Sequence, residues 1–218
     1  MDKAEWDERY RSAQLVWSAA PNQFVAELLA DLDPGRALDL ACGEGRNALW
    51  LAERGWQVTA VDFSPVALAK AGTLAEARGL QVDWITADVT EYQPAAGAYD
   101  LVLIAYLHLV AEQISRVLHA AAAAVAPGGR LLLVGHDRAN VTEGVGGPQD
   151  PAVLHTVEAV TSALGGLRVE RAEQARRSVE VEGAPRSAID TLVLATRDRR
   201  HTHQPADNHG GDRDVSSC

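Results

Sequence analysis

The chain has 218 residues, 47% of them hydrophobic, and a formal net charge of −10 at pH 7. That length suffices for one domain with a sizeable core, and the acidic balance argues against a general nucleic-acid-binding surface. No run approaches the roughly 18 apolar residues of a membrane span, and the charged N-terminus carries no apolar signal segment. The two cysteines form no disulfide framework, which fits a reduced cytoplasmic enzyme.

Residues 1–20 are polar and are expected to form a short amphipathic segment that caps the domain. Trp6 and Tyr10 are four positions apart and would share one helix face, which plain packing explains. The stretch from Pro21 to Asp33 has an apolar stripe and is predicted to be a helix. A turn at Asp33-Pro34-Gly35 ends it.

The stretch from Ala37 to Ala48 contains a short apolar strand, a turn with Gly43 and Gly45, and then helix periodicity. This order is the first half of a nucleotide-binding βαβ unit. Glycines let a ligand approach the backbone closely, and the helix start offers unpaired N–H groups. Asp39 and Glu44 would repel a pyrophosphate, but they would suit a ligand that carries an ammonium and a sulfonium.

Asp62 ends the second expected strand, about twenty residues beyond the glycine turn. A carboxylate in this place can accept two hydrogen bonds from a ribose diol. Nicotinamide enzymes and adenosylmethionine enzymes both use this device, so Asp62 supports a ribose without choosing the cofactor. Phe63, next to it, is expected to pack on an adenine face.

The rest of the chain is expected to alternate strands and helices before two late strands that follow each other directly. Pro127-Gly128-Gly129 is predicted to be a turn before the fifth strand. Residues 138–151, which follow that strand, are rich in turn formers and are predicted to form a substrate lid. The polar tail, residues 198–218, is expected to be disordered, with His201, His203 and His209 solvated rather than metal-bound. The predicted strands are 36–41, 57–61, 81–86, 99–104, 130–134, 168–175 and 189–196, and the later helices are 46–54, 65–78, 113–126 and 152–164.

Several of these stretches carry a family resemblance. Asp-x-x-x-Gly-x-Gly, from Asp39 to Gly45, resembles motif I of class I S-adenosylmethionine-dependent methyltransferases. The run Tyr-Asp-Leu-Val-Leu-Ile at 99–104 resembles motif IV, and the Pro-Gly-Gly junction also fits. Trp6–Tyr10, Gly43–Ala48 and Val61–Ser64 look like the small bacterial tellurite-resistance-type or thiopurine-methyltransferase-like branch.

The resemblance implies an α/β, Rossmann-like, doubly wound sheet of seven strands in a domain spanning residues 21–197. The sheet would be mostly parallel, with an antiparallel last strand and the order 3-2-1-4-5-7-6. The cofactor implied is S-adenosyl-L-methionine, and the N-terminal segment would close over the substrate side. Asp88 would accept a hydrogen bond from the adenine amino group, although it could instead shape the turn into Thr90. The cofactor-binding residues expected are Asp39, Ala41, Gly43, Gly45, Asn47, Asp62, Phe63, Asp88, Val89 and Ile104.

Methyl transfer is an in-line displacement from an activated donor, so the protein mainly supplies proximity and orientation. A base is needed only when the acceptor must lose a proton. His108 and His136 lie at adjacent predicted strand ends, and either is a candidate base or a histidine bonded to backbone. Tyr106 is expected to orient the acceptor. No metal is expected.

The acceptor is expected to be a small molecule, with no nucleic-acid or membrane partner and a monomeric or homodimeric protein. The Asn-Pro-Pro-Tyr type signature of amino-group methylation on DNA or protein is absent, because the chain reads Ile104-Ala105-Tyr106-Leu107 there. A nicotinamide-dependent oxidoreductase is the first alternative; Asp39, Glu44 and the lack of a recognisable Tyr-x-x-x-Lys pair argue against it. A non-catalytic adenosylmethionine-binding sensor is the second, because its binding residues would look the same.

Overall fold

The computed structural model describes residues 3–16 and 18–199, and its centre is a seven-stranded sheet in the order β3-β2-β1-β4-β5-β7-β6. β7 runs antiparallel to both of its neighbours, β5 and β6, and the other pairs are parallel. The predicted fold class and strand order are thereby confirmed. The strands are β1 Arg36–Leu40, β2 Gln57–Asp62, β3 Val82–Thr86, β4 Tyr99–Ala105, β5 Val125–His136, β6 Arg168–Val181 and β7 Ala184–Thr196.

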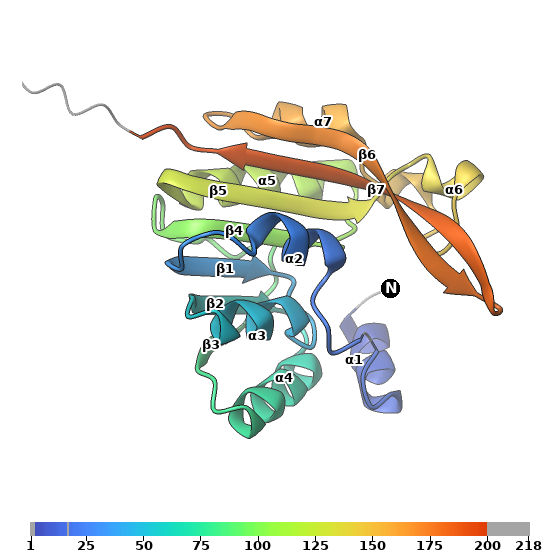
Figure 1. The fold of residues 1–218 in the computed structure, drawn as a ribbon, viewed down its shortest axis with the longest axis horizontal. Coiled ribbons are helices and arrows are strands. Elements are labelled where there is room, and N and C mark those ends of the chain that lie inside the picture. Colours follow the sequence, from blue (N-terminus) through green and yellow to red (C-terminus); the bar gives the residue numbers. More distant parts are fainter. Residues whose placement is uncertain (1–2, 17, 200–218) are drawn as a thin grey trace, which may run out of the picture.

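Helices cover both faces of the sheet (Figure 1). α2, α3 and α4 pack on one face, and α5 and α7 pack on the other. No helix in the described parts of the chain is long and apolar enough to cross a membrane. The helices are α1 Lys3–Ser12, α2 Gln23–Leu29, α3 Arg46–Glu53, α4 Pro65–Ala77, α5 Ala111–Ala124, α6 Asn140–Glu143 and α7 Val157–Ala163, with a 3₁₀ turn at Pro151–Val153.

The central strands are buried on both faces, and alternate side chains enter two separate cores. Leu103 of β4 packs with Phe24 and Leu29 of α2, whereas its neighbour Ile104 packs with Leu118 of α5. This double burial explains why the central strands read as nearly continuous apolar runs.

Three predicted boundaries are corrected. Pro127-Gly128-Gly129 is not a turn before the strand but an irregularity inside β5. Tyr99 pairs with Val125, the register then shifts, and pairing resumes between Leu101 and Arg130. Gly128 absorbs the shift with φ +83° and donates its N–H to the Arg197 carbonyl at 2.8 Å.

The helix predicted from residue 152 begins only at Val157, where the Thr156 hydroxyl caps it by accepting from the Ala159 N–H. Before it, Leu154 is buried and His155 forms a bridge with Asp137, so the backbone is extended there. The last two strands are also longer than predicted. Glu182 and Gly183, both with positive φ, join them in a two-residue hairpin turn.

β5 pairs with β7 only over Asp190–Thr196, so the distal part of the β6–β7 hairpin projects beyond the sheet (Figure 1). The proposed tail from residue 200 onward, including His201, His203 and His209, lies outside the described residues.

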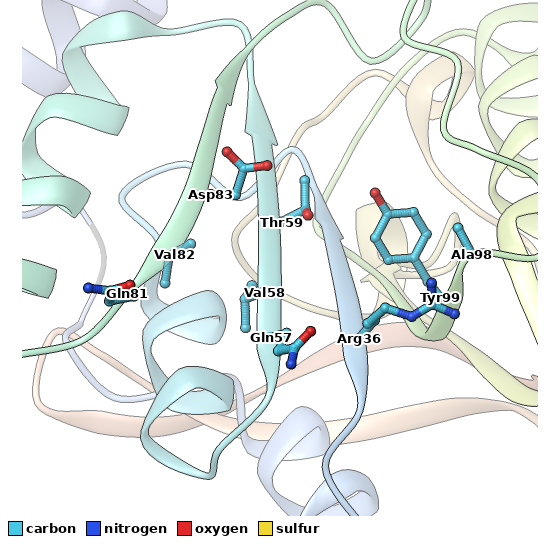
Figure 2. A pocket seen from close by; sticks show the side chains of 9 residues that line it. All are labelled: Arg36, Gln57, Val58, Thr59, Gln81, Val82, Asp83, Ala98 and Tyr99. Carbon is cyan, nitrogen blue, oxygen red and sulfur yellow. The ribbon is translucent and has the colours of Figure 1, made fainter.

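Residues 87–98 join β3 to β4 through turns and irregular backbone. An open hollow of about 560 Å³ lies at the starts of β1 to β4, lined by polar side chains that include Arg36, Gln57 and Tyr99 (Figure 2). This hollow is at the opposite edge of the sheet from the glycine turn. It is therefore separate from the predicted site.

Candidate active site

The predicted functional residues gather at the carboxyl ends of the parallel strands. β1 and β4 are neighbours there although two strands separate them in sequence, so the strand order reverses between them. In an open α/β sheet such a switch point is where ligands bind. α1, α6 and the projecting β6–β7 hairpin lie around this same edge (Figure 1).

The turn after β1 is tightly curled, because Ala41, Gly43 and Gly45 all have left-handed φ, at 58°, 55° and 76°. For Ala41 that conformation costs about 1–2 kcal/mol. Strained backbone of this kind clusters at functional sites. The start of α3 immediately follows the turn, as the sequence predicted.

Asp62, at the end of β2, holds this turn in place. Its Oδ2 accepts the Gly43 N–H at 2.8 Å, and its Oδ1 accepts the Ser64 N–H at 2.9 Å. Burial raises the pKa of Asp62, and these two N–H groups oppose the rise. Each carboxylate oxygen can accept more than one hydrogen bond, so the capacity to accept from a diol is retained.

Asp39 is a buried carboxylate that makes no hydrogen bond within the described part of the chain. Its side chain is 1% exposed, and neither oxygen accepts a hydrogen bond within the described residues. Burial, with a smaller effect from the charge of Asp62, raises the pKa of Asp39 to about 7, and the Arg46 guanidinium and the nearby Ala48 N–H act in the opposite direction. A buried carboxylate whose oxygens accept no hydrogen bond is costly, so Asp39 is suited to receive a cationic or N–H-bearing group of a ligand.

Glu44 has a different role from the one predicted. Its Oε2 accepts the Val16 N–H at 2.8 Å, and its Oε1 lies 3.2 Å from Lys70 Nζ. Lys70 also donates to the carbonyls of Tyr10 and Ala13. Glu44 thus fastens the N-terminal segment to α4, and its charge is neutralised within the chain. Of the two acids expected to attract a cation, only Asp39 fits.

The N-terminal helix α1 lies over the glycine turn. Trp6 and Tyr10 stack with ring centres 5.5 Å apart, as their spacing predicted. A Cβ built on Gly43 would lie 3.0 Å from the Tyr10 hydroxyl, and the Ser64 hydroxyl bonds to the Asp7 carboxylate. Gly43 is therefore favoured by its backbone angle, and a larger residue would also press on the Tyr10 hydroxyl.

The adenine-binding residues predicted from the sequence are less clearly arranged. Asp88 is exposed and its Oδ1 accepts from both the N–H and the hydroxyl of Thr90, each at 2.8 Å, so it does shape its turn. Val89 and Ile104 point their side chains into the core, which leaves only their backbone groups for a ligand. Asn47 accepts the Asn22 N–H at 2.9 Å and ties α3 to α2. Phe63 is half-buried beside Asp62.

A second cluster begins at Tyr106, which follows β4 with φ 60°. Its hydroxyl donates to Asp190 Oδ2 at 2.8 Å and accepts from Arg177 Nε at 3.0 Å. Arg177 Nε also donates to Asp190 at 2.7 Å. Burial, followed by the charge of Asp190, raises the pKa of Tyr106. The Tyr106 ring lies 5.0 Å from that of His136, centre to centre.

His136 and Asp190 face each other across β5 and β7. His136 Nδ1 lies 3.2 Å from Asp190 Oδ1, within ion-pair distance, although the two groups are not oriented as in a hydrogen bond. Asp190 is fully buried. Burial pushes its pKa upward, but His136 and Arg177 outweigh that effect and hold the pKa below its usual value.

His108 matches the alternative in which a histidine bonds to backbone. Its Nε2 accepts the His136 N–H at 3.1 Å, and the two rings stack with centres 5.3 Å apart. Burial, with smaller effects from the nearby imidazoles of His155 and His136, lowers the pKa of His108 to about 3. Of the two predicted bases, His136 is the better placed, because within the described residues its ring bonds to no backbone group.

Three residues of this cluster were missed by the sequence reasoning: His155, Arg177 and Asp190. His155 Nε2 lies 2.9 Å from the Leu107 carbonyl, and burial lowers the pKa of this residue. Asp137, which adjoins His136 in sequence, points away and accepts from Gln174 and Thr191. The available signal was Asp190 itself, an acid within an otherwise apolar late strand.

The two clusters form one site. The Arg46 guanidinium, next to the glycine turn, lies 6.0 Å from the centre of the Tyr106 ring and interacts electrostatically with Asp39. Tyr106 in turn contacts His136. A continuous row of side chains therefore connects the turn after β1 to the ends of β4 and β5.

The loop after β5 is ordered over this site. Asn140 anchors it by accepting the Ile189 N–H at 2.7 Å and donating to the Gly146 carbonyl at 2.8 Å. A Cβ built on Gly147 would lie 2.6 Å from His136 Nε2, so this glycine lies directly against the imidazole. Within residues 3–16 and 18–199, no three His, Cys, Asp or Glu side chains are grouped to hold a metal ion.

The strand order of the sheet is that of an α/β fold shared with solved structures of S-adenosylmethionine-dependent methyltransferases. Residues 37–129 match the family model described as a methyltransferase domain. Demethylmenaquinone methyltransferase from Thermus thermophilus is 40% identical over 112 residues, covering 50% of this chain and 51% of that protein. Ribosomal RNA small subunit methyltransferase C from Chromohalobacter salexigens is 33% identical over 155 residues, covering 61% of this chain and 45% of that protein.

The solved structure of TehB from Haemophilus influenzae has the same fold, with a TM-score of 0.69 at 18% identity. The alignment covers 89% of this chain and 67% of that one. The chain spans about half the length of the curated relatives that it matches.

Proposed function

We propose that this chain is an S-adenosylmethionine-dependent methyltransferase that transfers a methyl group in line to a small-molecule acceptor. The observation that carries the proposal is the buried carboxylate of Asp39 beside the glycine turn, whose oxygens accept no hydrogen bond within the described residues. A cofactor with an ammonium and a sulfonium would bring a positively charged group to pair with this carboxylate. A dinucleotide would bring its pyrophosphate anion to the same turn.

The other residues of the turn fit the same cofactor. Asp62 would accept from the ribose hydroxyls, while Gly43 and Gly45 allow close approach to the backbone. Asp88 and the Val89 N–H would meet the adenine, with Phe63 on its face, and the backbone of Ala41 and Ile104 and the side chain of Asn47 would border the site. When bound, the cofactor supplies an activated methyl group. The chain supplies orientation, with Tyr106 and His136 on the acceptor side.

The acceptor is proposed to be a small molecule because α1, the loop over His136 and the β6–β7 hairpin surround the site. The net charge of −10 disfavours RNA, although two relatives are named as ribosomal RNA methyltransferases. Membership of the tellurite-resistance-type branch is proposed from the motifs in Trp6–Tyr10 and Gly43–Ala48. We further propose a cap at residues 1–20, a domain at 21–197, a cytoplasmic location and a monomer or homodimer.

Calorimetric titration with S-adenosylhomocysteine, with NAD in parallel, tests the cofactor. We expect micromolar binding of the first ligand and none of the second. Asp39→Asn should weaken S-adenosylhomocysteine binding at least tenfold, because it removes the charge that pairs with the ammonium. Asp83→Asn, an exposed acid at the distant hollow, is the matched control and should bind normally. Binding of NAD alone would overturn the proposal.

A further inference from the structure

We infer that Asp190 is a positioning residue that orients His136 as a general base, and that the methyl acceptor carries a proton-bearing oxygen, as in a phenol or an alcohol. The inference rests on the proposed methyltransferase function and assigns the acceptor side of the same site. It depends on the arrangement of four side chains brought together from distant parts of the chain: Tyr106, His136, Arg177 and Asp190.

The first step concerns the charge at Asp190. This carboxylate is fully buried, and Arg177 and Tyr106 both donate to its Oδ2. The Arg177 guanidinium compensates a charge that would otherwise be costly to bury. The other Asp190 oxygen, Oδ1, lies 3.2 Å from His136 Nδ1, outside hydrogen-bond alignment, and has no hydrogen-bond partner within the described residues.

The second step concerns the tautomer of His136. Since Oδ1 of an ionised carboxylate can only accept, the proton of a neutral His136 belongs on Nδ1. Nε2 then carries the free lone pair and is the atom able to take a proton. It lies on the ring edge covered by Gly147, so an acceptor reaches it when the loop over His136 yields. When Nε2 has taken a proton, Asp190 stabilises the resulting imidazolium, as in the histidine–carboxylate pairs of hydrolases.

The third step is the chemistry that such a base serves. The acceptor oxygen uses a lone pair to form the new O–CH₃ bond as the C–S bond breaks and its electron pair stays on sulfur. The proton of the acceptor oxygen moves to His136 Nε2 and is later released to water. A thiolate or a metalloid anion binds already deprotonated, so its methylation does not need this base. A neutral hydroxyl needs it, because a protonated ether oxygen would otherwise result.

The tautomer of His136 can be measured on the full chain without knowing the acceptor. Long-range ¹H–¹⁵N NMR of histidine-labelled protein distinguishes the two tautomers, and His136→Gln assigns the signal. At about pH 8 we expect the Nδ1–H form in the wild type. An Nε2–H tautomer there would overturn the inference, because that nitrogen could then not accept a proton.

Asp190→Asn sharpens the test. Tyr106 and Arg177 both donate toward Oδ2, so the amide oxygen of the substituted side chain is expected to take that place and its NH₂ group to face His136. His136 should then switch to the Nε2–H form. Asp137→Asn is the matched control, a neighbouring buried acid that bonds to Gln174 and Thr191 and should leave the tautomer unchanged. An unchanged tautomer in folded Asp190→Asn would overturn the inference. If that variant fails to fold, the wild-type spectrum decides.

Methylation of simple phenols tests the acceptor class. With labelled S-adenosylmethionine at about pH 8, neutral phenol is compared with 4-nitrophenol, which is largely ionised there. We expect Asp190→Asn to lower turnover on phenol at least tenfold and turnover on 4-nitrophenol much less. Equal losses on both, or no methylation of either by a wild-type protein that binds S-adenosylhomocysteine, would overturn the acceptor class. Failure to bind S-adenosylhomocysteine would instead overturn the proposed function and leave the tautomer result standing.

Discussion

Single buried acids set the chemistry of this molecule at the residue scale. Asp39, Asp62 and Asp190 are all nearly inaccessible, yet each has a different environment. Asp190 has strong donors, Asp62 has two backbone N–H groups, and Asp39 has no hydrogen-bond partner within the described residues. Burial penalises the ionised form in every case, so the partners decide which acids stay charged.

The pKa of Asp39 has a predictable effect on stability. Below about pH 4 its carboxyl is neutral in both the folded and the unfolded chain. As the pH rises from there to about 7, the value to which burial raises this pKa, the unfolded chain ionises first. The free energy of unfolding of the ligand-free protein should therefore fall over this window, by on the order of 4 kcal/mol.

Urea unfolding at about pH 5 and pH 8 measures the larger part of this change. Asp39→Asn should remove most of the fall and be more stable than the wild type at pH 8, because an amide does not ionise. Other groups that titrate between these pH values are present in both proteins and cancel in the comparison. The same pH dependence in both proteins would show that Asp39 ionises freely in the fold.

At the scale of elements, two segments cover the site. α1 is fastened to α4 through Lys70, and the loop after β5 is fastened to β7 through Asn140. Lys70 donates to two carbonyls near the end of α1, and Asn140 accepts the Ile189 N–H of β7. Removing either side chain should free the segment that it holds and leave the sheet intact.

Lys70→Ala should weaken S-adenosylhomocysteine binding and speed proteolysis near residues 10–16. The change removes the Lys70 ion pair from Glu44, which is 4% exposed, and it removes two hydrogen bonds to the chain around the end of α1. Arg78→Ala is the control, since its ion pair with Glu53 is partly exposed and worth little. Equal proteolysis rates in wild type and Lys70→Ala would show that Lys70 is not what holds α1 in place.

Two adjacent glycines allow the loop over His136 to be tested with a matched pair. Gly146 and Gly147 have nearly the same φ, 74° and 72°, so alanine costs each about the same backbone strain. Only at Gly147 would the new Cβ collide with His136. Gly147→Ala should lower methyl transfer at least tenfold more than Gly146→Ala, with S-adenosylhomocysteine affinity little changed in either. Equal activities of the two variants would show that the contact between this loop and His136 does not affect methyl transfer.

At the scale of the whole molecule, the β6–β7 hairpin both completes the sheet and supplies residues to the site. β7 pairs with β5 over seven residues and brings Asp190 opposite His136, while β6 supplies Arg177. The two late strands thus complete a site whose proposed cofactor half comes from the first half of the chain. We expect the domain to unfold as a unit for this reason.

Thermal unfolding with S-adenosylhomocysteine at about 100 times its dissociation constant tests that unity. Ligand binding should stabilise the fold by roughly 2.7 kcal/mol and raise Tm by about 5–10 °C in a single transition. Asp39→Asn, compared at the same ligand concentration, should show a much smaller rise. Two separate transitions, only one of them shifted, would instead make the hairpin an independent unit.

The sequence by itself determined the sheet, its order through the family resemblance, and the residues of the glycine turn. The strands and the glycine turn are local features, because apolar runs, glycine pairs and an acid at a strand end can be recognised from nearby residues. The start of β5 ahead of Pro-Gly-Gly, the start of α7 and the length of the hairpin were missed. Pairing with distant strands overrode local turn preference at these places.

Only the tertiary structure decided which polar groups meet. It paired Glu44 with Lys70 rather than with a ligand, turned Asp137 away from His136, and brought Asp190 and Arg177 to that histidine instead. The register of β7 on β5 places residues 136 and 190 opposite each other, and no local pattern encodes that register. Charge partners across a sheet depend on strand pairing between distant segments, so sequence reasoning identified the candidate base without the acid that orients it.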